Sequence, residues 1–248
     1  MLPGITAIVV SAGLIGLLRH CLDCLAHALA ASGRAHRAVV VDNASELPYR
    51  QADLRTEGLQ VELIRLDIPR GFGAANNAAV ARYPGEDFLL VNNDVFVHPQ
   101  AVGHMLTLLE ATPRAGICGA RLVFPDGTIQ HRGVVFGKGQ KGPYHLDRRR
   151  PGHLVARLDG EFQAVTGACM LIRGEAWQQL GGFDEDYPFG LEDIDFCLRA
   201  RQQGWRVLCA AGVDSLHFES MTPGRVELDV PSRRLFMERW RDRTTIDG

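Results

Sequence analysis

Apolar runs and amphipathic segments alternate through the first half of the chain. The short runs at residues 5–10, 38–41, 61–66 and 88–91 are rich in apolar residues and have the length of strands. Between them, residues 17–31 and 74–81 place apolar side chains at helical spacing. Strands that alternate with helices usually pair in parallel, so the pattern predicts an α/β fold with a mainly parallel central sheet and flanking helices.

The second half continues with a helical segment at 101–111, a strand-like run at 116–124 and a turn at 125–128. A chain of 248 residues is long enough for one large domain. We predict a single domain over 1–248, with a Rossmann-like nucleotide-binding half at 1–94, an acceptor and catalytic half at 95–219, and a tail at 220–248. The apolar residues of this charged tail are Leu235, Phe236 and Trp240. They leave two readings open, docking as a short helix and self-association into a homodimer.

An acidic segment precedes a strongly amphipathic helix near residue 192. Gly181 and Gly182 suit the end of the preceding helix, because glycine tolerates a left-handed backbone. Glu192 and Asp193 fall in the first turn of the next helix, where the helix dipole favours carboxylates. Residues 194–198 supply its apolar packing side, and Arg199 and Arg201 suit its end. The helix is thus predicted to hold the carboxylates of Glu192 and Asp193 rigidly in place. The alternative is that these carboxylates only cap the helix.

Six pieces of the chain, in this order, resemble the nucleotide-sugar glycosyltransferases of family 2, inverting enzymes with a GT-A fold. They are the strand at 5–11, VVVDNAS at 39–45, RGFGAANN at 70–77, LLVNND at 89–94, TGACML at 166–171 and the acidic segment at 181–201. Within the family, the chain looks most like the rhamnosyltransferase-like branch. The resemblance implies a GT-A fold and transfer of a sugar from a nucleoside-diphosphate sugar to a glycan, glycolipid or small-molecule acceptor.

The resemblance also assigns roles to residues. Asp193 matches the general base and Glu192 a residue that positions the acceptor. Asp94, Asn92 and His217 match the site of Mg²⁺ or Mn²⁺, although Asn92 stands where relatives usually carry a carboxylate, so one anionic charge is missing. A histidine after an apolar strand, taken alone, is more often a packed residue. The positions that match the donor site are Ser11, Asp42, Asn43, Arg70, Gly71, Phe72, Asn76, Asn92, Asn93 and Asp94.

Two features of the donor positions rest on the residues themselves. Asp42 and Asp94 directly follow predicted strands, and ligands bind beyond the carboxyl ends of parallel strands, so both are expected in one crevice. For Asp42, capping of the following segment is the alternative. At 11–13 the chain has Ser-Ala-Gly where relatives commonly have a Tyr-Asn pair after Thr or Ser. Stacking of a nucleobase on an aromatic ring therefore does not carry over to Ala12.

Composition and charge limit the classes of partner and the compartment expected for the protein. A net charge of −2 and a pI near 6.5 provide no broad basic field, which argues against nucleic acid as a partner. The apolar stretch at 5–18 is shorter than a membrane span, so we expect a cytoplasmic protein, with association at the inner face of the membrane left open. Six scattered cysteines fit a reducing compartment. Cys21 and Cys24 form a CxxC on a helical pattern, where core packing is favoured over a metal or redox site.

The glycine-rich basic stretch at 137–152 is predicted to be a mobile surface loop, either a solvated turn or a lid over phosphates. Two other functions compete with sugar transfer. A catalytically weak or inactive nucleotide- or sugar-binding protein on the same scaffold is suggested by Asn92 and the missing Tyr-Asn pair. A nucleotidyltransferase is disfavoured, because the chain lacks a glycine-rich, lysine-bearing triphosphate loop.

Overall fold

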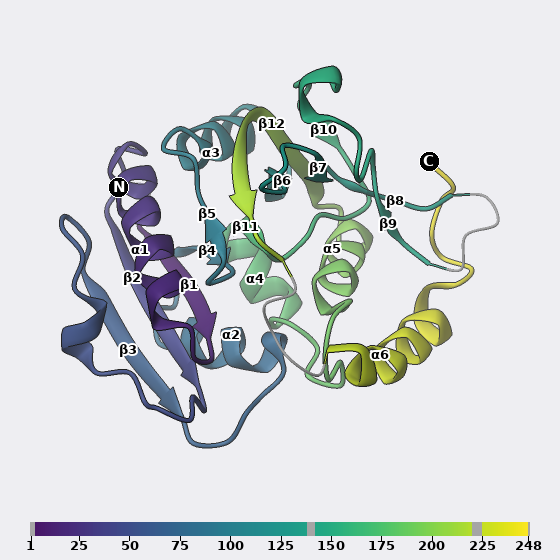
Figure 1. The fold of residues 1–248 in the computed structure, drawn as a ribbon. Helices are drawn as coiled ribbons and strands as arrows, with labels where there is room; N and C mark the ends of the chain where they lie inside the picture. The colour runs from purple at the N-terminus through teal and green to yellow at the C-terminus, as the bar shows by residue number, and fades with distance from the viewer. Residues whose placement is uncertain (1–2, 138–141, 220–224, 248) are drawn as a thin grey trace.

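The computed structural model of the protein describes residues 3–137, 142–219 and 225–247 (Figure 1). The strands are β1 (Ile5–Ser11), β2 (His36–Asn43), β3 (Val61–Leu66), β4 (Asp87–Val91), β5 (Val95–Phe96), β6 (Ala115–Val123), β7 (Ile129–His131), β8 (Val134–Val135), β9 (Tyr144–His145), β10 (Gly160–Glu161), β11 (Cys169–Ile172) and β12 (Arg206–His217). The α-helices are α1 (Ile15–Ala30), α2 (Phe72–Val80), α3 (Ala101–Ala111), α4 (Gly174–Leu180), α5 (Glu192–Gln202) and α6 (Arg225–Trp240). Two 3₁₀ turns are η1 (Gln51–Leu54) and η2 (Gly152–Leu154).

One twisted sheet runs through the molecule in the order β10-β12-β6-β11-β4-β1-β2-β3. β3, β2, β1 and β4 are parallel, and β6 and β12 are parallel to each other. β11 lies between β4 and β6 and is antiparallel to both. The predicted mainly parallel α/β sheet is confirmed. β11 runs in the opposite direction to these parallel strands. It therefore begins at the edge of the sheet where they end.

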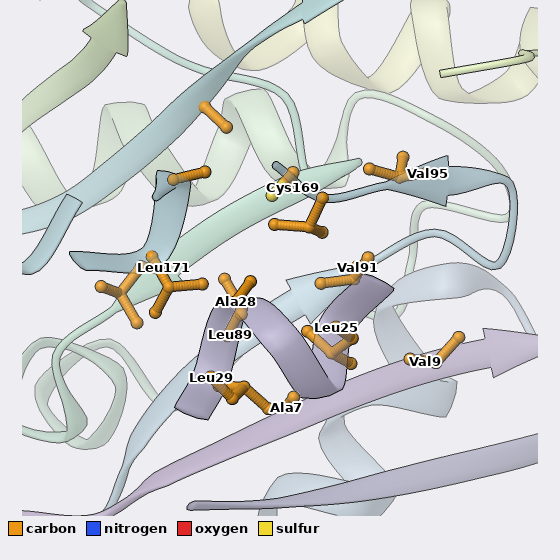
Figure 2. Close-up of a cluster of buried hydrophobic side chains, with 14 of the residues drawn as sticks. Ala7, Val9, Leu25, Ala28, Leu29, Leu89, Val91, Val95, Cys169 and Leu171 are labelled. Carbon is orange, nitrogen blue, oxygen red and sulfur yellow. The ribbon is translucent and has the colours of Figure 1, made fainter. Parts of the chain in front are cut away.

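Apolar side chains alternate along the central strands and fill two cores. On β1, Ile5, Ala7 and Val9 join the first core, which is covered by α1 and α3. Figure 2 shows Ala7 and Val9 of this core together with Leu25, Ala28 and Leu29 of α1. Ile8 points the other way into the second core, under α2, α4, α5 and α6. Burying each such aliphatic side chain stabilises the fold by about 1.5–3 kcal/mol. The two cores hold the strands in place from both faces. The polar residues gather at the sheet edge where the parallel strands end.

The acidic segment folds as its sequence predicts. α4 ends at Leu180, and Gly181 follows in the left-handed region with φ of 72°. α5 begins at Glu192, and its predicted packing side, residues 194–198, is buried. In the tail, α6 docks against the second core through Phe236 and Trp240, which are 2% and 4% exposed. Docking as a helix is thus the arrangement found, while self-association stays a prediction.

The basic stretch at 137–152 is tied down where the structure describes it. Residues 138–141 lie outside the described part, and β9 pairs with β8. Arg148 forms an ion pair with Glu219 at 2.7 Å, and the guanidinium of Arg149 lies 3.7 Å from the centre of the Phe124 ring. These partners come from distant segments, so local composition alone did not reveal them.

The CxxC pair lies on α1. Cys21 is fully buried in the first core, and burial raises the pKa of its thiol well above the ordinary value. Cys24 is partly exposed, and both thiols are free. A buried thiol of high pKa is a poor nucleophile and metal ligand, so this arrangement fits the packing interpretation. Among the described helices, none is long and apolar enough to cross a membrane.

Candidate active site

The turn after β4 carries the first group of polar residues. The backbone N–H of Asn92 donates to the carbonyl of Ala168 at 2.9 Å, and Val95 N–H donates to the Asn92 carbonyl at 3.0 Å. These bonds hold the turn against the start of β11. Asp94 is 5% exposed, whereas the side chain of Asn92 is half-buried. The predicted metal residues 92 and 94 therefore project from a rigid turn at the carboxyl edge of the sheet.

Asp94 meets His217, at the end of β12, as the family resemblance implies. His217 Nε2 lies 3.1 Å from Asp94 Oδ1, and both side chains are buried. The other ring nitrogen, Nδ1, lies 2.6 Å from Oε1 of Gln130 on β7. With this amide oxygen as acceptor, Nδ1 carries a proton, and Nε2 is the ring nitrogen that faces the carboxylate. A carboxylate oxygen and an imidazole nitrogen that lie side by side can be neighbouring ligands of one divalent cation, and a second partner on the ring is usual for metal-bound histidine.

The residues present fit a divalent cation that is completed by a ligand. They supply one carboxylate, one imidazole and the amide of Asn92, for which no hydrogen bond is seen within the described ranges. Hard cations prefer such oxygen donors, and Mg²⁺ commonly takes part of its shell from phosphates. Over residues 3–137, 142–219 and 225–247, no group of three or more His, Cys, Asp and Glu side chains is arranged to hold a metal. A cation held here would accordingly depend on further oxygen atoms from a bound molecule.

Asp193 is held by backbone donors at the start of α5. Gly167 N–H donates to Oδ2 at 2.7 Å and Ile194 N–H donates to Oδ1 at 2.8 Å. Burial raises the pKa of the carboxyl, although these two backbone hydrogen bonds oppose the rise. The preceding Leu191 has φ of 70°, an uncommon conformation for a non-glycine residue that often marks a functional turn. A fixed carboxylate of raised pKa is suited to accept a proton.

The segment 166–168 joins the two groups, and its role could not be assigned from sequence. Ala168 accepts from the turn that carries Asp94, and its neighbour Gly167 donates to Asp193. A Cβ at Gly167 would lie 3.1 Å from the Phe72 ring and 3.2 Å from Asp193 Cβ. Because real side chains rarely approach so closely, a Cβ at this position would force Phe72 or Asp193 to shift by a few tenths of an ångström. The turn that carries Asp94 and the candidate base Asp193 thus share one short connector.

Glu192 lies where α2 meets α5. The side chain is 4% exposed. A Cβ added at Gly73 would come within 3.4 Å of Glu192 Cγ and 2.9 Å of Phe183 Cβ. Gly71 is equally close-packed, with the carbonyl oxygens of Tyr187 and Pro188 at 3.2 and 2.9 Å from an added Cβ. Gly71 and Gly73 thus lie directly against the acidic segment.

Ser11 sits in a hydrogen-bonded cluster at the carboxyl end of β1. Its Oγ lies 2.8 Å from the Tyr49 hydroxyl and accepts from Asn93 Nδ2 at 2.8 Å. The Tyr49 hydroxyl also donates to the carbonyl of Gly13. An aromatic residue from the loop after β2 therefore lies beside the turn at 11–13 that lacks the Tyr-Asn pair. Only the fold reveals this neighbour, because 38 positions separate the two residues.

Asp42, at the end of β2, is fully buried and already well supplied with donors. Ser45 N–H and Tyr49 N–H each donate at 3.0 Å, and Arg65 Nη1 donates at 2.7 Å. Burial by itself raises the pKa of Asp42, but these hydrogen bonds, together with one from the Ser45 hydroxyl, bring it below its ordinary value. Asp42 pairs in register with Ser11, so both lie at the same edge of the sheet, and the internal bonds of Asp42 match the capping alternative.

The remaining donor positions divide by exposure. Asn43 and Arg70 exchange two hydrogen bonds, Nδ2 to the Arg70 carbonyl at 2.8 Å and Arg70 N–H to Oδ1 at 2.9 Å. Arg70 is exposed and Phe72 half-buried. Asn76 is fully buried and donates to the Phe72 carbonyl at 2.8 Å, within α2. Arg70 and Phe72 thus face accessible space, whereas Asn76 lies inside the helix contact.

The sequence comparisons identify the family that this site belongs to. Residues 3–228 match the family model described as "Glycosyltransferase like family 2". The chain belongs to this family. The predicted resemblance is thereby confirmed, and the named relatives support its rhamnosyltransferase-like branch.

Curated relatives cover most of this glycosyltransferase chain. It is 34% identical over 215 residues to the O-antigen biosynthesis protein RfbC of Myxococcus xanthus, covering 82% of this chain and 16% of that protein. An uncharacterized protein, y4gI of Sinorhizobium fredii, is 36% identical over 79% of this chain and 22% of its own length. An N-acetylglucosaminyl-diphospho-decaprenol L-rhamnosyltransferase of Mycobacterium tuberculosis is 28% identical over 79% of this chain and 70% of that protein. The chain thus spans about a fifth of the first two relatives' length.

Solved structures share the fold. The mannosyltransferase PcManGT of Pyrobaculum calidifontis, in complex with GDP-Man and Mn²⁺, superposes with a TM-score of 0.67 at 19% identity, over 98% of this chain and 65% of that one. GalNAc-T7 with UDP, GalNAc and Mn²⁺ gives a TM-score of 0.58 at 14% identity, over 87% and 44% of the two chains. The predicted GT-A fold is confirmed.

Proposed function

We propose that the chain is an inverting glycosyltransferase that moves a sugar from a nucleoside-diphosphate sugar to an acceptor hydroxyl. One observation supports this above the others. The connector 166–168 binds the turn of Asp94 on one side and Asp193 on the other, so a cation-binding carboxylate and a candidate base lie on either side of one short segment. A single displacement needs these two functions on opposite sides of the anomeric carbon.

The chain's own residues supply the acid–base chemistry. Asp193 accepts the proton of the acceptor hydroxyl while that oxygen bonds to the anomeric carbon and the bond to the nucleoside diphosphate breaks. The configuration at that carbon inverts because the attack comes from the side opposite the leaving group. Its raised pKa makes Asp193 a stronger base than an ordinary aspartate, and such catalysis contributes about a hundred- to ten-thousand-fold in rate.

Asp94 and His217, with the amide of Asn92, are the residues that would hold Mg²⁺ or Mn²⁺. When bound, the cation neutralises charge on the leaving diphosphate. Gln130 keeps His217 oriented through Nδ1. The approach of the donor is lined by four residues: Ser11, Asn93, Asn43 and Arg70. The titles of two structural neighbours name Mn²⁺ together with a nucleotide or nucleotide sugar, which supports this assignment.

For the acceptor, we propose a glycan or a glycolipid of surface-polysaccharide assembly, handled in the cytoplasm at the inner face of the membrane. The support is indirect, since one relative is named for O-antigen biosynthesis and another for rhamnosyl transfer to a diphospho-decaprenol. The acidic segment beside Asp193 is the surface on which the acceptor would lie.

The test is release of nucleoside diphosphate from a panel of UDP-, dTDP- and GDP-sugars, with and without Mn²⁺. We expect slow, metal-stimulated release from one donor, lost in Asp94→Ala and in Asp193→Asn. Asp126→Asn is a matched control, because that carboxylate lies in an exposed turn with 57% of its side chain accessible. Tight nucleotide binding without release from any donor, even with a glycolipid extract added, would favour a binding protein, and release of pyrophosphate would favour a nucleotidyltransferase.

A further inference from the structure

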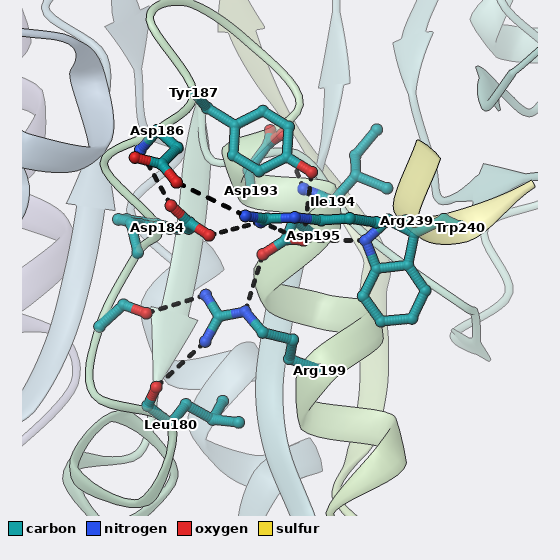
Figure 3. A network of polar contacts seen from close by, with 12 residues as sticks. Leu180, Asp184, Asp186, Tyr187, Asp193, Ile194, Asp195, Arg199, Arg239 and Trp240 are labelled. Carbon is teal, nitrogen blue, oxygen red and sulfur yellow. Dashed lines mark hydrogen bonds and ion pairs between the residues drawn. The ribbon is translucent and has the colours of Figure 1, made fainter. Parts of the chain in front are cut away.

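We propose that Arg239 and Trp240, at the end of α6, are positioning residues for the candidate base, a proposal that rests on the proposed function. The family match ends at residue 228, so residues 229–247 carry no role inherited from it. In the structure this segment reaches back to α5 and to the acidic loop formed by residues 183–191 (Figure 3). The last turn of the chain's last helix thus contacts the elements that present Asp193.

Asp195 is the centre of this contact. Its carboxylate is fully buried, two residues after Asp193 in the first turn of α5. Trp240 Nε1–H donates to Oδ1 at 2.8 Å, Arg199 Nε–H donates to Oδ2 at 2.7 Å and the Tyr187 hydroxyl lies 3.2 Å from Oδ1. A buried charge is costly unless donors surround it, so losing one donor disturbs the whole group. Three chain segments therefore depend on one carboxylate.

Arg239 extends the contact to the acidic loop. Its guanidinium forms an ion pair with Asp184, lies 3.7 Å from Asp186 and 3.6 Å from Asp195, and stacks over the Tyr187 ring at 5.4 Å. Figure 3 shows it between the loop carboxylates and the start of α5. A planar guanidinium can serve several carboxylates at once in a way that an ammonium cannot. Arg239 thereby fixes the distance between the loop and α5.

The same acidic loop also contacts the residues before α2, among which predicted donor positions lie. The Tyr187 and Pro188 carbonyls lie against Gly71, directly before α2, as the near-contact of an added Cβ shows. Beyond α6, Thr245 exchanges two hydrogen bonds with Gln163, three residues before the 166–168 connector, at 2.5 and 2.9 Å. The tail therefore braces the loop, the helix and the connector that together hold Asp193. We expect that losing these tail contacts moves Asp193 out of line with the acceptor hydroxyl, while every reacting group is still present.

The experiment compares two variants with two matched controls in the full chain. Arg239→Gln removes the charge, and Trp240→Phe removes one N–H while keeping an aromatic ring. Arg234→Gln is the control on the same helix, since the side chain of Arg234 is 83% exposed and its ion pair, among the residues that the structure describes, is with Glu238 at the surface. Trp205→Phe is the control for the indole, which there donates to Gln179. We expect the first two to lower kcat by about tenfold with the donor KM unchanged, and the controls to leave both unchanged.

Two further measurements keep a positioning role apart from a loss of folding and from failure of the proposed function. Thermal unfolding gives the folded fraction, and Arg239→Lys should recover only part of kcat because it restores charge but not the planar fork. Amide hydrogen exchange at residues 166–168 and 184–195 should accelerate in Arg239→Gln and not in Arg234→Gln, whether or not a donor is turned over. Unchanged exchange there, or a kcat loss fully matched by the unfolded fraction, overturns the proposal.

Discussion

Gly167 donates its backbone N–H to Oδ2 of Asp193 across 2.7 Å, and a side chain on the donor would have to push Phe72 or Asp193 aside. This hydrogen bond connects the candidate base to the sheet edge that also carries the turn of Asp94. It makes an inconspicuous glycine a determinant of catalytic geometry, because a displacement of about 1 Å at a reacting group can cost roughly a hundredfold in rate.

Gly167→Ala should therefore lower kcat by about a hundredfold, because the new Cβ would push apart the Phe72 ring and Asp193. Gly103→Ala on α3 is the control, since nothing lies within 4 Å of an added Cβ there. Steady-state kinetics on both variants, with circular dichroism to verify folding, provide the comparison. Wild-type kcat in Gly167→Ala would show that the contact is not needed.

The pH profile should reflect the environment of Asp193. Burial raises its pKa in the folded protein, and the base must be ionised to accept a proton. The acidic limb of kcat is therefore expected above the ordinary aspartate range, with activity falling as the pH drops through the raised pKa. Initial rates at saturating donor across the acidic range measure this. A limb at the ordinary aspartate value would argue that Asp193 is not the group that titrates.

Metal affinity should depend on Gln130. Gln130→Leu removes the acceptor of His217 Nδ1, so the ring is free to turn and to change tautomer. We expect weaker Mn²⁺ binding by about ten- to a hundredfold, the usual cost of losing a partner behind a metal ligand. Electron paramagnetic resonance titration of Mn²⁺ in the presence of nucleoside diphosphate measures binding without turnover. Gln178→Leu, on the exposed side of α4, should bind Mn²⁺ like the wild type.

Much of this arrangement could be predicted from sequence, for identifiable reasons. Local periodicity and glycine placement determine where α5 begins, so Glu192 and Asp193 were found. Asp94 and His217 were linked through family resemblance, which the fold supports by bringing them to 3.1 Å. Gly167 lies within the TGACML motif, but nothing in the sequence around it indicates a contact with Asp193.

Other partners could not be found from sequence because they depend on strand order. The reversed β11 lies between β4 and β6, which brings residues 166–168 to the sheet edge, and β7 carries Gln130 to His217. Neither pairing has a local signature, since 87 positions separate Gln130 from His217. The contact of Trp240 with Asp195 likewise needs the tail to fold back over α5.

Donor binding should be sensitive to Tyr49. Tyr49→Phe removes the hydroxyl that links Ser11 to the Gly13 carbonyl and leaves the ring in place. The turn after β1 would loosen, and we expect the donor KM and the nucleotide Kd to rise by about fivefold with kcat nearly unchanged, in the range of one lost hydrogen bond. Tyr83→Phe is a matched control, because its hydroxyl pairs with Glu62 on β3. Isothermal titration with the cognate nucleotide measures the Kd of both variants. Equal effects of Tyr49→Phe and Tyr83→Phe would contradict a local role for Tyr49.

Asp42 should make stability depend on pH. Burial alone would raise its pKa, but hydrogen bonds from Ser45, Arg65 and Tyr49 lower it below the unfolded value. Its contribution to the free energy of unfolding is therefore present above the unfolded pKa and is lost as the pH falls through the lower folded pKa. Asp42→Asn should destabilise the protein by about 2 kcal/mol at neutral pH and flatten the acidic loss, because one buried donor is left without its acceptor. Urea unfolding at neutral and acidic pH measures both. A variant as stable as the wild type at neutral pH would show that the bonds around Asp42 do not stabilise the fold, and would leave ligand contact as the reason for a carboxylate at this position.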